Sequence, residues 1–212
     1  MIRVLIADDH AIVRQGLKQI LAESSEVTVT GEAANGVDAV RLSRSGEYDV
    51  VVLDVSMPDR NGLDVLKQIR KDVPQLPVLM LSMHPEDQLG VRAIKEGAAG
   101  YLSKQSAPEQ LVAAIQQVAS GRKYISSTLA EQLANAIGGG EAALHDTLST
   151  REYQTLCMIA SGKTLTAVGE ALKISVKTVS VYRARLLEKM RMKNNAELTH
   201  YAIKHNLIDS GT

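Results

Sequence analysis

The stretch "IRVLIADDHAIVRQGL", residues 2–17, joins an apolar run to an amphipathic pattern through two adjacent carboxylates, Asp8 and Asp9. The apolar run predicts a buried β-strand, and the apolar spacing that follows predicts a helix. Aspartate is a favoured helix N-cap, but a cap needs only one side chain. The second acid therefore requires another explanation.

The same alternation of strand and helix continues to about residue 120, which is typical of stacked βα units and a parallel sheet. The predicted strands are residues 2–7, 27–33, 49–55, 77–82 and 99–103. The predicted helices lie near residues 11–22, 35–45, 62–71, 86–96 and 107–119. The run "DVVVLDV" is almost continuously apolar, as expected for a central strand covered on both faces. We therefore predict a doubly wound α/β domain built on a (βα)5 parallel sheet.

The pattern changes after Gly121. Residues 122–146 read as a linker with one short helix and a flexible connector of three glycines, 138–140. From residue 147 to residue 212 the pattern is of short helices only, which predicts a small all-α domain. Ser149 and Glu152 have the spacing of a capping box at its first helix. The predicted domains are thus 1–121 and 147–212.

Polar residues end four of the predicted strands. They are Asp8 and Asp9, then Asp54, then Ser82, then Lys104. In a doubly wound sheet the ligand site lies beyond the carboxyl ends of the strands. Three converging carboxylates repel one another, and a hard divalent cation, Mg²⁺, resolves that repulsion. Each residue taken alone could be a cap, a turn residue or a surface charge, but together they predict a phosphoryl site with Asp54 as the nucleophile.

These motifs resemble the receiver domain of two-component response regulators: "ADD" after the first strand, "DVSMP" from Asp54, Gly62, "LS" at 81–82 and "YLSK" ending at Lys104. The resemblance covers residues 1–120 and implies that Asp54 accepts a phosphoryl group from a sensor histidine kinase. It further implies roles that the pattern alone does not supply. Asp9, Asp54 and the Ser56 carbonyl would bind Mg²⁺ with Asp8 acting through water, Ser82 and Tyr101 would form a switch pair, and Ser56 and His84 would tune the lifetime of the phosphoryl group.

The charge of the chain is divided between its two parts. Residues 1–146 carry a net charge of −5, and residues 147–212 carry +5. Seven of the basic residues lie between 173 and 193, which favours an anionic partner. A solvated charged face is the alternative explanation. In the run "LKISVKTVSVYRARLLEKM" the spacing places apolar side chains (Val179, Leu186, Leu187, Met190) inward and others (Lys177, Ser180, Arg183, Ala184) outward, as in a helix-turn-helix.

Residues 147–210 resemble the LuxR-type helix-turn-helix of NarL/FixJ-class regulators. By position in that motif, Lys177, Thr178, Tyr182 and Lys189 would contact DNA phosphates, and Ser180, Val181 and Ala184 would face bases, with Arg183 or Arg185 contributing. The small residues at base-facing positions offer mainly van der Waals contact, which leaves Arg183 as the candidate for polar readout. Two features depart from the motif: "LTA" at 165–167 replaces a common Asn-Lys-Glu run, and Gly169 stands where alanine is usual.

Together these features predict a transcription regulator in which Mg²⁺-dependent phosphorylation of Asp54 controls dimerisation and binding to double-stranded DNA. An aspartyl-phosphate hydrolase is the enzymatic alternative, but such enzymes carry a second aspartate where this chain has Ser56. A protein-binding regulator without DNA contact is a third hypothesis. A single cysteine and the absence of an apolar run of about 18 residues favour a cytoplasmic protein without a membrane segment.

Overall fold

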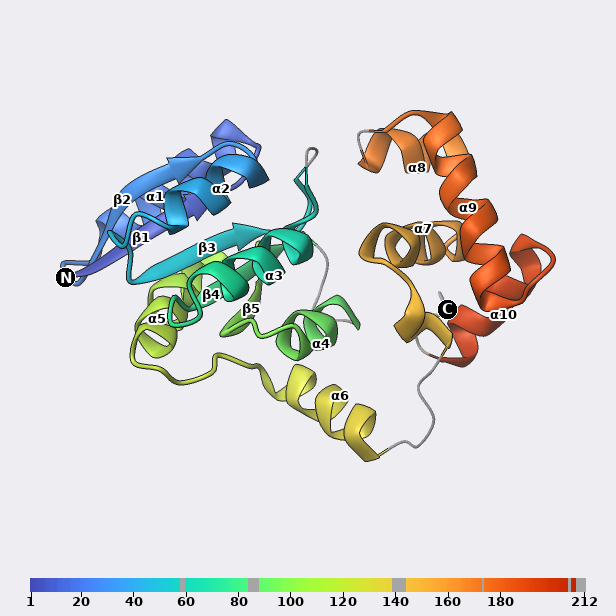
Figure 1. Ribbon diagram of the computed structural model, residues 1–212. Helices are drawn as coiled ribbons and strands as arrows, with labels where there is room; N and C mark the ends of the chain where they lie inside the picture. Colours follow the sequence, from blue (N-terminus) through green and yellow to red (C-terminus); the bar gives the residue numbers. More distant parts are fainter. Residues whose placement is uncertain (58–59, 84–87, 139–143, 173, 206, 209–212) are drawn as a thin grey trace. The chain divides into compact units, whose positions relative to one another are not determined.

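The computed structural model describes residues 1–57, 60–83, 88–138, 144–172, 174–205 and 207–208. The chain forms two compact units, Met1–Gly138 and Gly139–Thr212 (Figure 1). In the described part of the chain, no helix combines the length and the hydropathy that crossing a membrane requires. The two units are treated separately below.

The first unit is built on a five-stranded parallel sheet in the order β2-β1-β3-β4-β5. Its strands are β1 (Ile2–Ala7), β2 (Val27–Ala33), β3 (Val50–Asp54), β4 (Val78–Ser82) and β5 (Gly100–Ser103). Its helices are α1 (Ala11–Ala22), α2 (Gly36–Ser43), α3 (Gly62–Asp72), α4 (Gln88–Lys95), α5 (Ala107–Ala119) and α6 (Ser127–Gly138). The doubly wound α/β fold that the sequence predicts is confirmed.

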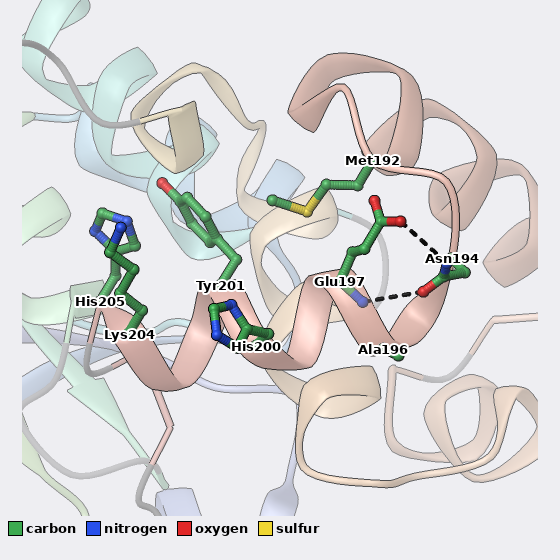
Figure 2. A pocket seen from close by; sticks show the side chains of 8 residues that line it. All are labelled: Met192, Asn194, Ala196, Glu197, His200, Tyr201, Lys204 and His205. Carbon is green, nitrogen blue, oxygen red and sulfur yellow. Dashed lines mark hydrogen bonds between the residues drawn. The ribbon is translucent and has the colours of Figure 1, made fainter.

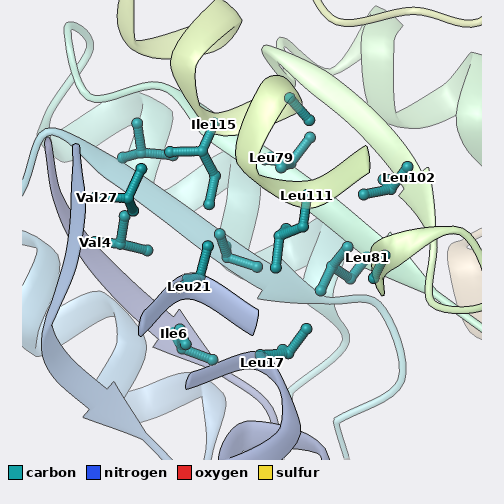
Figure 3. Packing of buried hydrophobic residues seen from close by; sticks show 14 of the residues in the cluster. Val4, Ile6, Leu17, Leu21, Val27, Leu79, Leu81, Leu102, Leu111 and Ile115 are labelled. Atoms are coloured by element: carbon teal, nitrogen blue, oxygen red, sulfur yellow. The ribbon is translucent and has the colours of Figure 1, made fainter. Parts of the chain in front are cut away.

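Hydrophobic residues fill both faces of this sheet, which explains the lack of alternation in the central strands. All five residues of β3 and all five of β4 are buried. On one face Val4, Ile6 and Val52 pack with Leu17 and Leu21 of α1 and with Leu111 and Ile115 of α5 (Figure 3). The side chains that alternate with them on the strands face the opposite side of the sheet, which α2 and α3 cover. The strands are therefore held rigidly, and so are the residues that follow them.

The second unit is entirely helical. It contains the short 3-10 helix η1 (Leu144–Thr147), then α7 (Thr150–Ala160), α8 (Leu165–Leu172), α9 (Val176–Met190) and α10 (Asn195–Lys204). The predicted capping box is present: the Ser149 side chain accepts from the Glu152 backbone N–H, and the Glu152 carboxylate accepts from the Ser149 N–H. Ser175 caps α9 in the same manner, by accepting from the Thr178 N–H. Cys157, within the apolar run of α7, is half-buried.

Candidate functional site

The acids of β1 and β3 meet at the carboxyl edge of the sheet. β1 lies between β2 and β3, so the order of the strands reverses there, and this is the place where doubly wound sheets bind ligands. Asp8 and Asp54 are almost fully buried, with 1% and 2% of their surface exposed. Burying two carboxylates is costly unless a cation accompanies them.

Lys104 supplies that cation in the structure. Its Nζ lies 2.6 Å from Asp8 Oδ2 and 2.9 Å from Asp54 Oδ1, and its side chain is only 8% exposed. Strand pairing fixes this position, because Ser103 pairs with Ser82 and the Lys104 N–H donates to the Ser82 carbonyl at 2.7 Å. The structure therefore brings together Asp8, Asp54, Ser82 and Lys104, which lie far apart in the sequence.

The local geometry around Asp54 depends on Gly62. The Gly62 N–H donates to the Val55 carbonyl at 2.9 Å, and a Cβ at position 62 would lie 2.8 Å from the Val55 Cα. Only a glycine lets α3 begin this close to the end of β3. Asn61 caps α3 by accepting from the Leu63 N–H. The segment that carries Ser56, which is half-buried, is thereby held beside Asp54.

The charges in this pocket perturb one another. Burial raises the pKa of Asp54 and the neighbouring Asp8 carboxylate raises it further, while Lys104 opposes both. Burial by itself would lower the pKa of Lys104, but attraction to Asp54 and the hydrogen bond to Asp8 outweigh burial, so that pKa is raised. Lys104 is therefore a permanent cation, and Asp54 is a carboxylate whose negative charge is only partly compensated.

The pocket has a donor set that fits a divalent cation. Asp8, Asp9, Asp54 and His10 each offer one ligand atom, and these atoms all lie within 4.8 Å of one another. Carboxylate oxygens are the ligands that Mg²⁺ prefers, so the acids fit the predicted metal. His10 was not anticipated. Its Nδ1 lies 3.0 Å from Asp9 Oδ1 and 3.2 Å from Asp8 Oδ1. The feature of the sequence that could have predicted this is its position directly after the two acids.

The two residues of the predicted switch pair lie on neighbouring strands. Ser82 ends β4, and Tyr101 is in β5, where it pairs with Met80. Both are fully buried. The structure thus places Tyr101 inside the protein next to the strand that ends at the acidic pocket. His84 lies outside the described residues.

In the second unit, α8 and α9 have the arrangement of a helix-turn-helix. Val179, Leu186 and Met190 are buried as the spacing predicts, and Leu187 is half-buried. None of the nine proposed DNA-contacting residues of α9 is buried. Six are exposed, namely Lys177, Ser180, Val181, Ala184, Arg185 and Lys189, and three are half-buried, namely Thr178, Tyr182 and Arg183. Packing explains why position 169 is a glycine where alanine is usual: a Cβ there would lie 2.9 Å from the Ile174 carbonyl oxygen.

Two basic residues of α9 have partners within the protein. Lys189 Nζ lies 2.7 Å from Glu152 Oε2, which ties α9 to the start of α7. Arg183 Nε donates to Asn195 Oδ1 at 2.7 Å. Any contact of Lys189 or Arg183 with DNA would compete with these interactions, and no pattern in the sequence predicts that competition.

Replacing Glu152 with Gln should lower the free energy of unfolding by about 1–2 kcal/mol at neutral pH. Hydrogen bonds to charged groups contribute about 1.5–3 kcal/mol, and solvent screening of the exposed Lys189 side chain reduces that contribution. Burial opposes ionisation of Glu152, but Lys189 and Ser149 outweigh it, so its pKa lies below the ordinary 4.5. The contribution is therefore present above pH 4.5 and is lost as the pH falls through the lower, folded-state value. Urea unfolding of both proteins at several pH values measures this difference.

The matched control for this substitution is Glu170→Gln, because Glu170 is exposed on α8 of the same unit. That variant should unfold like the wild type at every pH. If the effect of Glu152→Gln were as large at pH 3 as at pH 7, the ion pair would not be its source.

The closing helix α10 contributes to the core of its own unit. The spacing of Leu198 and Ala202 suits either a core or the pairing of two DNA-binding modules, and both side chains are fully buried within the unit. Beside α10 lies a pocket of about 600 Å³ (Figure 2). Tyr201 and His205 stack along it with ring centroids 4.1 Å apart, and the Tyr201 hydroxyl lies 2.9 Å from Nδ1 of the buried His145. The accessible face of α10, which includes Ile203, is what remains for a partner.

Comparisons with known proteins agree with this geometry. Residues 4–116 match the family described as response regulator receiver domain, and residues 146–202 match bacterial regulatory proteins of the luxR family. The chain is 40% identical to the response regulator UvrY of Escherichia coli, over all of this chain and 98% of that protein. It is 36% identical to the response regulator GacA of Pseudomonas aeruginosa, over the full length of both chains.

The chain is also similar to solved structures. RcsB of Salmonella enterica serovar Typhimurium, solved bound to the promoter rprA in the presence of phosphomimetic BeF3-, is 25% identical with a TM-score of 0.62; the match covers 94% of this chain and 97% of that one. One explanation accounts for the matching families, for the acidic pocket around Lys104 and for the helix-turn-helix of α8 and α9. The chain belongs to the NarL/FixJ type of response regulators, which join a receiver domain to a LuxR-type DNA-binding domain.

Proposed function

We propose that Asp54 accepts a phosphoryl group from a sensor histidine kinase and that this modification controls binding to double-stranded DNA. The observation that carries the proposal is the buried Lys104 ammonium that bridges Asp8 and Asp54 at the carboxyl edge of the sheet. An aspartate with a partly compensated charge at the reversal of strand order is placed for reaction with an incoming electrophile.

In the proposed reaction, a carboxylate oxygen of Asp54 attacks the phosphorus of a phosphohistidine. A bond forms between that oxygen and phosphorus, the phosphorus–nitrogen bond breaks, and the histidine keeps the electron pair. Lys104 would hold one phosphoryl oxygen and the Ser82 hydroxyl would donate to another. Positioning and charge neutralisation of this kind are most of what phosphoryl transfer asks of a protein.

Mg²⁺ is the proposed cofactor, with Asp9, Asp54 and the Ser56 carbonyl as its ligands and Asp8 acting through water. When bound, the ion neutralises charge on the phosphoryl oxygens. The direct ion pair of Asp8 with Lys104 supports the less direct role for Asp8. Ser56 and His84 are the residues that we propose adjust the lifetime of the phosphoryl group.

For DNA, we propose that α9 enters the major groove. Lys177, Thr178, Tyr182 and Lys189 would contact phosphates, and Ser180, Val181, Arg183, Ala184 and Arg185 would lie near the bases. The first group sets affinity and its dependence on salt, and the second sets the sequence preference. The structure of RcsB with a promoter, and another described as two RcsB dimers bound to two parallel DNAs, support DNA binding by a homodimer of this chain.

Replacing Lys177 with Ala should weaken binding to all duplexes nearly equally and should reduce the slope of log K against log salt by about 1. Replacing Arg183 with Ala should instead change the preference between sequences, by about 1–3 kcal/mol at the base it contacts. Fluorescence anisotropy with selected and scrambled duplexes at several salt concentrations separates the two effects. The control, Lys71→Ala, removes an exposed charge at the end of α3 and should change neither.

We also propose that the chain has three parts, 1–121, 122–146 and 147–212. A cytoplasmic location is part of the same proposal. The family is one of transcription regulators, which supports a regulatory role over the hydrolase alternative.

The proposal is tested by treating the protein with acetyl phosphate and Mg²⁺. Intact-mass measurement should show the gain of one phosphoryl group, and anisotropy should show tighter DNA binding. A phosphorylated protein with unchanged DNA binding would favour the protein-binding alternative.

A further inference from the structure

The chain that follows α5 is attached to the edge of the sheet before α6 begins. Tyr124 forms a parallel bridge with Gly100: its N–H donates to the Ala99 carbonyl at 2.9 Å, and its carbonyl accepts from the Tyr101 N–H at 3.3 Å. A Cβ on Gly100 would lie 2.9 Å from the Tyr124 Cβ, so this close approach requires a glycine. The backbone of Tyr101 is therefore bonded directly to the segment that leads into α6.

α6 then packs on α4, and the contact is a side chain in a notch. Leu129 of α6 is fully buried. A Cβ added to Gly90 of α4 would lie 2.9 Å from Leu129 Cδ1, 3.2 Å from Leu129 Cδ2 and 3.6 Å from Tyr101 Cδ1. The missing side chain of Gly90 thus creates the space that Leu129 fills. Leu129 and the ring of Tyr101 border the same space.

The described part of α6 has few other buried contacts. Among residues 127–134, whose side chains are described, Leu129 is the one that is buried. Gln132 Oε1 is enclosed without a hydrogen-bond partner in the described part of the chain, which opposes docking. Among the side chains described for α6, Leu129 thus makes the one fully buried apolar contact, so a small change in the notch is expected to affect docking.

We propose that Leu129 is a positioning residue of the phosphorylation switch: by filling the notch over Gly90 it holds the ring of Tyr101 in place, and a shift of that ring toward Ser82 releases α6. The proposal rests on the function proposed above, in which Ser82 contacts the phosphoryl group. A ring that moves toward Ser82 leaves the space that it borders together with Leu129, so docking of α6 and the shifted ring would oppose each other. Because α6 leads directly to the DNA-binding unit, its release changes the tether of that unit.

Two quantities measure the coupling between α6 and the phosphoryl site: the docking of α6 and the affinity for a phosphoryl mimic. If docking of α6 opposes the active state, removing Leu129 must strengthen binding of a phosphoryl mimic by the same factor by which the mimic weakens docking. Beryllofluoride with Mg²⁺ serves as that mimic, and titration calorimetry gives its affinity. Hydrogen–deuterium exchange of the α6 amides reports docking. A purely structural role for Leu129 would change stability and leave the affinity for beryllofluoride unchanged.

In the wild type we expect beryllofluoride to speed exchange of the α6 amides three- to tenfold, the same factor as the change in affinity expected for the variant below. Leu129→Ala should show fast exchange without the mimic and should bind beryllofluoride three- to tenfold more tightly. Gly90→Ala should do the same, because its new methyl group displaces the Leu129 methyls. In the double variant the clash is absent, so it should match Leu129→Ala alone rather than add to it.

Two controls separate these effects from general damage. Gly16→Ala adds a methyl group to α1 where no atom lies within 4 Å, and Glu131→Ala removes an exposed side chain of α6; both should behave like the wild type. If acetyl phosphate failed to phosphorylate Asp54, the proposed function would fail. If Asp54 is phosphorylated but α6 exchange is the same in both states, or Leu129→Ala leaves the affinity for beryllofluoride unchanged or weaker, the coupling through Leu129 is wrong.

Discussion

Replacing Asp54 with Asn is expected to abolish the gain of a phosphoryl group and, with it, the phosphorylation-dependent rise in DNA affinity. The amide has nearly the same shape but is not a nucleophile toward phosphorus. We expect the ratio of DNA affinities with and without acetyl phosphate to fall from roughly tenfold, a typical coupling between two sites, to 1. Intact-mass measurement and fluorescence anisotropy on the same samples give both quantities.

Stability should not fall with this substitution. Burial and the Asp8 carboxylate raise the pKa of Asp54, so the ionised side chain lowers the free energy of unfolding at neutral pH. The neutral amide removes that cost, while Lys104 keeps Asp8 as a partner. Urea unfolding should therefore show an equal or higher free energy of unfolding. Asp64→Asn, an exposed change in the first turn of α3, should leave both phosphorylation and stability unchanged.

Replacing Lys104 with Met is expected to cost about 3 kcal/mol of unfolding free energy when Mg²⁺ is removed, since breaking a buried ion pair leaves uncompensated charge. The carboxylates of Asp8 and Asp54 would then lack their shared cation. Mg²⁺ should restore more stability to the variant than to the wild type, because the ion replaces the lost charge. The phosphorylation-dependent rise in DNA affinity should also be lost. Urea unfolding with Mg²⁺ and with a chelator measures the first two effects.

A surface ion pair supplies the matched control. Lys67 pairs with Glu96 at 2.9 Å, but both side chains are substantially exposed. Lys67→Met should therefore change the unfolding free energy by less than about 1 kcal/mol, whether or not Mg²⁺ is present. A Lys104→Met protein as stable as Lys67→Met would mean that the acidic pocket does not need its cation.

The fold was predictable because strand and turn signals agree with one another along the chain. The apolar runs that end at Ala7, Asp54 and Ser82 are continuous because both faces of the sheet are covered. The carboxyl ends of parallel strands share one edge, so acids after β1 and β3 had to meet. The capping box of Ser149 was equally accessible, because its two residues are three apart and local geometry alone decides it.

What could not be predicted depends on contacts between distant residues. Lys189 finds Glu152 across 37 positions, and no periodicity reveals that pairing. The burial of Leu198 and Ala202 follows from how α7 and α10 pack, whereas their spacing suits either a core or an interface. Leu129 lies over Gly90 because α6 packs on α4, two helices whose contact no local pattern reveals. In each case the local pattern leaves two arrangements open, and tertiary packing selects one.

The central claim is that one carboxylate, Asp54, controls the DNA affinity of the whole chain. Its most direct test is a DNA titration of phosphorylated and unphosphorylated portions of one preparation, using a duplex selected from a random-sequence pool, with phosphoryl content measured on the same portions. The account predicts that affinity rises with the fraction of protein phosphorylated at Asp54, and that a chelator of Mg²⁺ during treatment prevents both changes. Equal affinity for the two portions, at full phosphorylation of Asp54, would contradict it.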